Sequence, residues 1–126
     1  MKKVVFVSLL SSALLFGGES VISYDCKFPS YSSPDGLQKS KNFSLKYKID
    51  TVSGKSYMIG NNGIGEVALI YNKMENSVTF IEITQTKNVT TTTISENGNA
   101  VHSRGIVMFK KLLPSQYYGT CSIELD

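Results

Sequence analysis

Strict alternation of apolar and polar residues is the feature that most constrains the fold of this chain. From Phe43 to Asp50, every second side chain is apolar and each neighbour is polar or charged. Because successive side chains of a β-strand point to opposite faces, this pattern predicts a strand with one buried face and one wet face. After residue 23 no segment shows the period of 3.6 residues that an amphipathic helix requires.

Turn-forming residues divide the rest of the chain into short segments of similar length. Asn61–Asn62–Gly63 and Asn97–Gly98–Asn99 are strong turn signals, because Asn and Gly tolerate positive φ. Alternation between such turns predicts about eight strands. They are expected at Tyr24–Phe28, Phe43–Asp50, Lys55–Gly60, Gly65–Tyr71, Ser77–Thr84, Asn88–Ile94, Ala100–Lys110 and Tyr117–Leu125.

Three stretches depart from simple alternation. Pro29 to Ser40 is rich in Ser and Lys and contains Pro34–Asp35–Gly36, so it is predicted to be an irregular surface loop. Pro114 is predicted to interrupt the chain before the last strand. In Ser77–Thr84 the apolar residues shift from even positions (Val78, Phe80) to odd positions (Ile81, Ile83). This shift predicts either a bulge near Phe80 or a strand covered on both faces.

The first 23 residues have the layout of a secretory signal peptide. A basic start precedes an uncharged apolar run from Val4 to Phe16, and small residues allow cleavage after Ser20 or after Ser23. The apolar run is shorter than the roughly 20 residues that cross a bilayer comfortably. We therefore expect residues 1–23 to be a signal peptide and residues 24–126 to be one exported domain, in the periplasm or secreted.

The positions of the two cysteines favour a β-barrel over a β-sandwich. Cys26 and Cys121 lie near opposite ends of the processed chain, and cysteines of exported proteins are more often paired than free. A bond between them would join the first strand to the last, which are the two edges that a barrel must bring together. The predicted fold is all-β: a small antiparallel up-and-down β-barrel closed by one disulfide, with a β-sandwich as the alternative.

Charge excludes one class of partner. Cleavage after Ser23 removes two lysines and one glutamate and leaves 11 basic and 9 acidic residues. So weak a positive charge predicts no nucleic-acid partner and gives no argument for an anionic membrane. No later segment is long and apolar enough to span a bilayer, so no stable membrane insertion is expected after cleavage.

His102–Ser103–Arg104 is the stretch with the most suggestive chemistry. His102 is the only histidine, and on a strand it shares a face with Arg104. The chain has no G-x-S-x-G elbow, no C-x-x-C motif and no ligand cluster of the kind that binds zinc, so we expect no enzyme, cofactor or metal. An enzyme that uses His102 with Glu82 or Asp50 is a weaker alternative, and it needs those groups within about 3 Å.

The favoured function is a non-enzymatic binding module for a small or cell-envelope ligand, held in the mouth of the barrel. A periplasmic protein-interaction or hydrolase-inhibitor module is the alternative. Glu82 is expected to need a partner if it points inward, and Arg104 is the candidate. The candidate ligand-binding residues are Glu82, His102, Arg104, Gln116, Tyr117 and Tyr118.

Two motifs carry a resemblance. Ala100–Val101–His102–Ser103–Arg104, followed by Pro114–Ser115–Gln116–Tyr117–Tyr118–Gly119–Thr120–Cys121, resembles a family of small exported bacterial proteins of uncharacterised function. The likeness runs from about Phe43 to Cys121, and it implies export and bacterial origin without a mechanism.

At the level of architecture, the chain is also similar to the small periplasmic lysozyme inhibitors, which are stapled β-barrels with a cysteine near each end. Their Ser–Gly–Ser loop is missing here, however, and a positive chain is a poor electrostatic match for a basic target. This likeness therefore implies a fold and no function.

Overall fold

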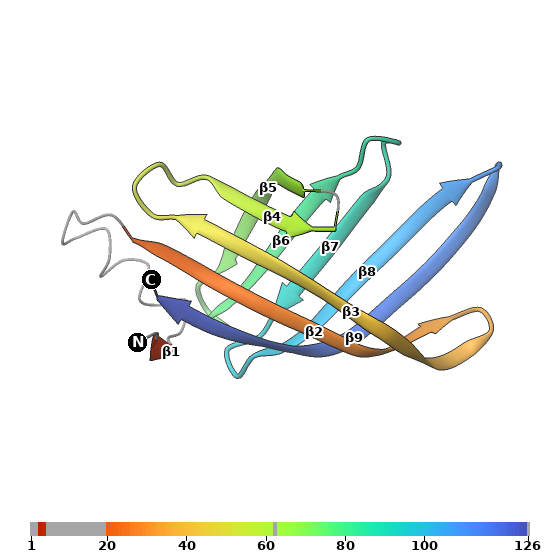
Figure 1. Cartoon of the computed structure of the whole chain (residues 1–126), viewed down its shortest axis with the longest axis horizontal. Coiled ribbons are helices and arrows are strands. Elements are labelled where there is room, and N and C mark those ends of the chain that lie inside the picture. Colours follow the sequence, from red (N-terminus) through yellow and green to blue (C-terminus); the bar gives the residue numbers. More distant parts are fainter. Residues whose placement is uncertain (1–2, 5–19, 62, 126) are drawn as a thin grey trace.

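The computed structural model describes residues 3–4, 20–61 and 63–125. In these residues one antiparallel sheet contains all the strands, and β2 to β9 close into an eight-stranded barrel (Figure 1). Neighbouring strands of the wall follow chain order, and β9 pairs with both β8 and β2. The strands are β1 (Lys3–Val4), β2 (Val21–Ser33), β3 (Gly36–Asp50), β4 (Ser56–Gly60), β5 (Gly63–Asn72), β6 (Ser77–Ile83), β7 (Val89–Ile94), β8 (Asn99–Met108) and β9 (Lys111–Leu125).

The predicted barrel is confirmed, and the sandwich alternative is wrong. Cys26 lies directly opposite Cys121 in the β2–β9 register, and the two form the predicted disulfide across the seam where the wall closes. Most of the predicted signal peptide lies outside the described residues. Within the described part of the chain, no helix has the length and apolar character needed to cross a membrane.

The stretch predicted to be an irregular loop is instead a long hairpin. β2 continues to Ser33 and β3 begins at Gly36, so the prediction of a loop from Pro29 to Ser40 is wrong. The register shifts once in this hairpin, between Phe28 and Ser30. Pro29 lies at this irregularity, and a bulge is one of the few places where a strand tolerates proline.

Two smaller predictions also fail. Pro114 does not interrupt the last strand, because β9 begins at Lys111 and pairs Pro114 with Gly105 of β8. The change in the apolar–polar alternation after Phe80 comes neither from a bulge nor from burial of both faces. β6 pairs with β7 without a register shift, and Ile83 is 67% exposed. The sequence pattern changes there because the outer face of β6 carries an exposed isoleucine.

Aromatic side chains fill the barrel. Tyr47 stacks on Phe80 with ring centroids 4.3 Å apart, and Tyr24 meets the same Phe80 edge-on at 5.4 Å. All three are buried, which removes large apolar areas from water and makes this cluster the centre of the core. The other buried apolar residues are Ile22, Cys26, Phe28, Leu45, Ile49, Val67, Val78, Ile94, Ala100, Cys121 and Ile123.

The two ends of the barrel differ. β2 begins and β9 ends at one of them, where Ile22 pairs with Leu125, and we call this the terminal end. At the opposite hairpin end, the β2–β3 and β8–β9 hairpins project beyond the wall and diverge toward their tips (Figure 1). β9 pairs with β2 only as far as Gln116, and β8 pairs with β7 only as far as Arg104. Residues 105–114 therefore form a two-stranded ribbon whose ladder partners lie within the ribbon itself.

Candidate functional site

The structure divides the candidate residues between the two faces of the barrel wall. Along β8, His102 is buried inside the barrel, and Arg104 has the same parity and points to the same face. Along β9, Tyr117 lies opposite His102 and shares its face, whereas Gln116 and Tyr118 point to the other face. The six candidate residues therefore do not line one common pocket.

On the inner face, His102 is enclosed by aromatic rings. Its imidazole lies 5.6 Å from the ring of Phe43, 5.9 Å from that of Phe28 and 6.1 Å from that of Tyr117. Its Nδ1 is hydrogen-bonded to Oγ1 of Thr92 at 2.7 Å, and the same hydroxyl is hydrogen-bonded to the Tyr47 hydroxyl at 2.5 Å. These contacts hold His102 in the core of the barrel.

Burial decides the charge of His102. Removal from water, and to a smaller extent the nearby positive charge of Arg104, together lower the pKa of the imidazole to about 4. The ring is therefore neutral at physiological pH. Burial likewise raises the pKa of the Tyr47 hydroxyl to about 12, so the hydrogen-bonded chain from Tyr47 through Thr92 to His102 carries no charge.

Acid should destabilise the protein through His102. The unfolded imidazole binds a proton near pH 6.5, but the folded one does so only near pH 4, so the unfolded state holds more protons between these values. The free energy of unfolding should therefore fall on acidification through this range, by up to about 3 kcal/mol from this group. His102→Gln, which cannot titrate, should lose less stability in urea denaturation at a series of pH values. Parallel losses in the two proteins would contradict the assignment.

A polar row crosses the inner face one step nearer the hairpin end. Glu82 of β6, Thr90 of β7 and Arg104 of β8 are paired successively in the strand registers. The partner that the structure gives Glu82 is Thr90, whose hydroxyl donates to Oε1 at 3.1 Å. Glu82 and Arg104 thus flank Thr90, and both are half-buried. An acidic and a basic side chain therefore lie between the aromatic core and the hairpin end of the barrel.

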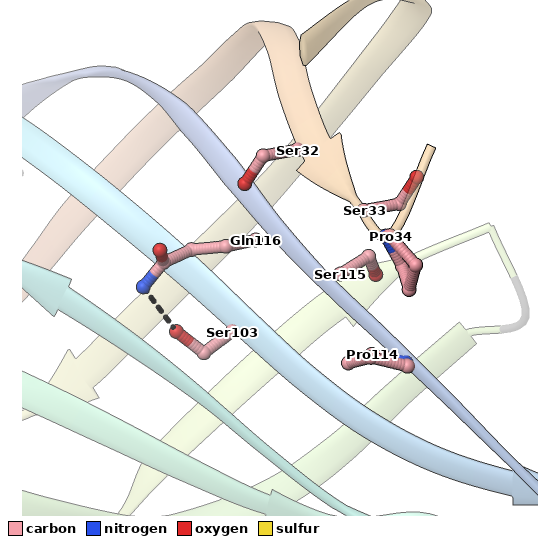
Figure 2. Close-up of a pocket in the computed structure, with 7 residues that line it drawn as sticks. All are labelled: Ser32, Ser33, Pro34, Ser103, Pro114, Ser115 and Gln116. Carbon is pink, nitrogen blue, oxygen red and sulfur yellow. Dashed lines mark hydrogen bonds between the residues drawn. The ribbon is translucent and has the colours of Figure 1, made fainter. Parts of the chain in front are cut away.

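On the outer face, four side chains form a hydrogen-bonded network. The hydroxyl groups of Ser32 and Tyr118 are hydrogen-bonded at 2.7 Å, and Tyr118 donates to Oε1 of Gln116 at 3.1 Å. The amide nitrogen of Gln116 donates to Oγ of Ser103 at 3.1 Å (Figure 2). The network fixes the orientation of the Gln116 amide, because both of its polar atoms are engaged.

A groove lies beside this network, where β9 separates from β2. Its volume is about 330 Å³, within the range of small-molecule sites. Figure 2 shows the turn after β2 on one side and β9 on the other, with Ser103 of β8 at the base of the network. Among the residues that the structure describes, the lining contains no charged side chain. It consists of Ser32, Ser33, Pro34, Ser103, Pro114, Ser115 and Gln116.

Most of these lining residues were missed by sequence reasoning. Only Gln116 was a candidate, and its neighbour Ser103 was singled out without a role. Ser32 and Ser33 lie in the stretch that was predicted to be an irregular loop. Pro114 was predicted to interrupt the chain before the last strand. The repeated serines between residues 29 and 40 were the available signal, because serines on paired strands can supply a row of hydroxyl groups.

Asp50, the other proposed catalytic partner of His102, has a structural role. Its carboxylate accepts hydrogen bonds from the backbone N–H groups of Val52 and Ser53 in the β3–β4 turn. These two bonds hold the pKa of the carboxyl below its usual range. Among the described residues, no group of three or more His, Cys, Asp or Glu side chains is placed to hold a metal ion.

Comparison of the chain with protein-family models, with curated proteins and with solved structures gave no match. The resemblance carried by residues 100–104 and 114–121 therefore remains a prediction.

Proposed function

We propose that the protein is an exported, non-enzymatic binding module, and that the groove between β2 and β9 takes an uncharged, hydroxyl-rich ligand such as a glycan of the cell envelope. The observation that carries this proposal is the outer-face network, which holds the Gln116 amide in one orientation at the groove. A polar group that is fixed before binding loses little conformational freedom when the ligand arrives.

The chemistry of the lining supports an uncharged ligand. Each serine hydroxyl can both donate and accept a hydrogen bond, which matches the hydroxyl groups of a sugar. Pro34 and Pro114 add apolar surface, against which the C–H face of a sugar ring can pack. An anionic ligand would find no cation in this lining, and a cationic ligand would find no carboxylate.

The position of β2 supports processing after Ser20 over processing after Ser23. Ile22 is fully buried and is paired with Ile49 on one side and Leu125 on the other. Cleavage after Ser23 would remove this core residue, and loss of a buried isoleucine costs about 2 to 5 kcal/mol. Export to the periplasm or the exterior is part of the proposal, and it would expose the disulfide to an oxidising compartment.

Native mass spectrometry of the protein purified from its own cell envelope tests the proposal. We expect a species that starts at Val21, carries the disulfide and retains a bound carbohydrate mass. Gln116→Ala should lower the affinity for that ligand by roughly tenfold or more, since it removes a fixed hydrogen-bonding group. Thr93→Ala is the matched control, because Thr93 makes an exposed hydrogen bond with Thr79 at 2.9 Å on the β6–β7 pair, away from the groove.

The alternative is a protein-interaction module, and one feature favours it. β4 covers β3 only from Lys46 to Ile49, so among the described residues the outer edge of β3 has no ladder partner before Lys46. A free edge can accept a strand from another protein, although Lys39 and Lys41 on this stretch discourage pairing with a second copy. A stoichiometric protein partner in the same mass spectra, without carbohydrate, would replace the first proposal with this one.

A further inference from the structure

The tip of the β8–β9 hairpin exposes several large apolar side chains to solvent. We define the hairpin tip as Val107, Met108, Phe109, Leu112 and Leu113. Phe109 is 89% exposed and Leu112 is 66% exposed. In the register, Val107 opposes Leu112 on one face and Ile106 opposes Leu113 on the other, so both faces of the ribbon are apolar. Such a surface is characteristic of an interaction site.

The turn at the tip is built from unfavourable residues. Phe109 and Lys110 have φ values of 53° and 64°, so both occupy the left-handed region. A two-residue hairpin turn of this kind strongly favours Asn-Gly, because a bulky side chain is disfavoured at positive φ. The chain thus places an almost fully exposed phenylalanine in this turn despite a local cost in stability. Strain of this kind is more often found where a residue has a function.

The charges around the tip are all positive. Lys110 and Lys111 lie between Phe109 and Leu112 of the hairpin tip, and residues 105–115 contain no aspartate or glutamate. The β6–β7 turn is tied to the ribbon, since the backbone N–H of Val107 donates to Oδ1 of Asn88 at 2.9 Å. That turn adds Lys87 and brings no acidic residue between positions 83 and 89.

The same turn extends the apolar surface. Ile83 and Val89 pair across its base, and they are 67% and 50% exposed. Glu82, the nearest acidic residue along the chain, accepts a hydrogen bond from Thr90 on the inner face. The tip and this turn together present apolar side chains with three lysines around them.

We propose that the hairpin tip docks into the headgroup region of an anionic lipid bilayer. Phe109 and its apolar neighbours would enter the boundary between headgroups and acyl chains, while the lysine ammonium groups contact lipid phosphates. The ribbon has free backbone edges, and unpaired N–H and C=O groups are not tolerated in hydrocarbon. Docking is therefore shallow, and it does not span the membrane.

Net charge does not indicate this surface. The whole chain carries only +3, because ten acidic residues, all of them outside residues 105–115, offset most of its 13 lysines and arginines. The β2–β3 hairpin, which projects from the same end, has Asp35 at its tip and a strand rich in serine. The difference between the two hairpins is what assigns the membrane contact to β8–β9.

Vesicle binding of the full chain tests the proposal, with phosphatidylcholine vesicles compared with vesicles that also contain phosphatidylglycerol. The wild type should bind the anionic vesicles more tightly, and added salt should weaken that binding. Phe109→Asn combined with Lys110→Gly installs the favoured turn, so it should raise the melting temperature by several degrees while binding falls roughly tenfold or more. A merely structural hairpin would show the first effect without the second.

Met74→Ser is the matched control. Met74 is 92% exposed, but it lies in the β5–β6 turn at the terminal end, so its loss should leave vesicle binding unchanged. The apolar N-terminal segment is the same in the wild type and in both variants, so a difference in binding between them comes from the substituted residues. Equal binding by wild type and double variant, or no binding by the wild type, would overturn the proposal. A dimer that the double variant abolishes, without vesicle binding, would overturn it in favour of a second copy of the chain.

Discussion

Replacing Cys26 and Cys121 together by alanine should lower the free energy of unfolding by about 4 to 5 kcal/mol. The two residues are 95 positions apart in sequence, so the bond closes nearly the whole folded chain into one loop. Without it, the unfolded chain regains the conformational freedom that the bond denies it. Since small domains have a total stability of about 5 to 15 kcal/mol, the variant should be partly unfolded near physiological temperature.

Urea denaturation measures this effect. The midpoint should fall, and the slope of the transition should rise, because an unbridged unfolded chain exposes more surface. Alanine is preferable to serine, because Cys26 is fully buried and a hydroxyl would need a new partner there. Wild type in reductant should behave like the double variant. A loss below about 1 kcal/mol would mean that the strand ladders hold the barrel closed without the disulfide.

Gly119→Ala should be the most damaging change of a single glycine, with a loss of roughly 3 kcal/mol or more. A Cβ at this position would lie 1.9 Å from the carbonyl oxygen of Lys27 and 2.8 Å from Cα of Phe28. Both obstacles are backbone atoms of β2 beside its register shift, so no side-chain rotation relieves the clash. The two strands would have to separate next to the disulfide.

Gly105→Ala is the matched control for this change. Gly105 also lies in a strand of the barrel, and a Cβ there meets no atom within 4 Å. Its replacement should leave stability within about 1 kcal/mol of the wild type or raise it slightly, because alanine restricts the unfolded chain. Thermal melting of the two variants compares them directly. Similar losses in both would show that the close approach at Gly119 is relieved at little cost.

Strand positions were predictable wherever one face of a strand meets the core. Phe43, Leu45, Tyr47 and Ile49 alternate in sequence, and three of them are buried in the barrel. The disulfide was predictable for a related reason, because a closed wall leaves the first and last strands side by side. Closure and connectivity followed from these two patterns together.

The outer half of the β2–β3 hairpin and the first residues of β9 were not predictable by the same means, although the strand predicted at Ala100–Lys110 matches β8. Alternation appears only when one face is buried, and the outer half of the β2–β3 hairpin has no core to face. Its serines and prolines therefore have the composition of a loop although the backbone is paired. Pro114 was misleading for a similar reason: β9 has passed beyond the end of β2 at that point, and a strand edge tolerates a missing N–H.

The candidate site was only partly predictable. Parity along β9 already separates Tyr117 from Gln116 and Tyr118, but the sequence does not say which face is enclosed. The structure encloses the face of His102 and opens that of Gln116. The groove depends on where β2 and β9 separate, and this is set by strand lengths that no local pattern encodes.

The arrangement of the two barrel ends has a practical consequence for how the molecule can be presented. β2 begins and β9 ends opposite the two projecting hairpins, so a tether added after β9 would orient every copy in the same way. On a sensor chip or bead, such a tether would leave the groove and the β8–β9 hairpin facing the sample. Immobilisation through lysine side chains would instead give mixed orientations and would block Lys110 and Lys111 beside the hairpin tip.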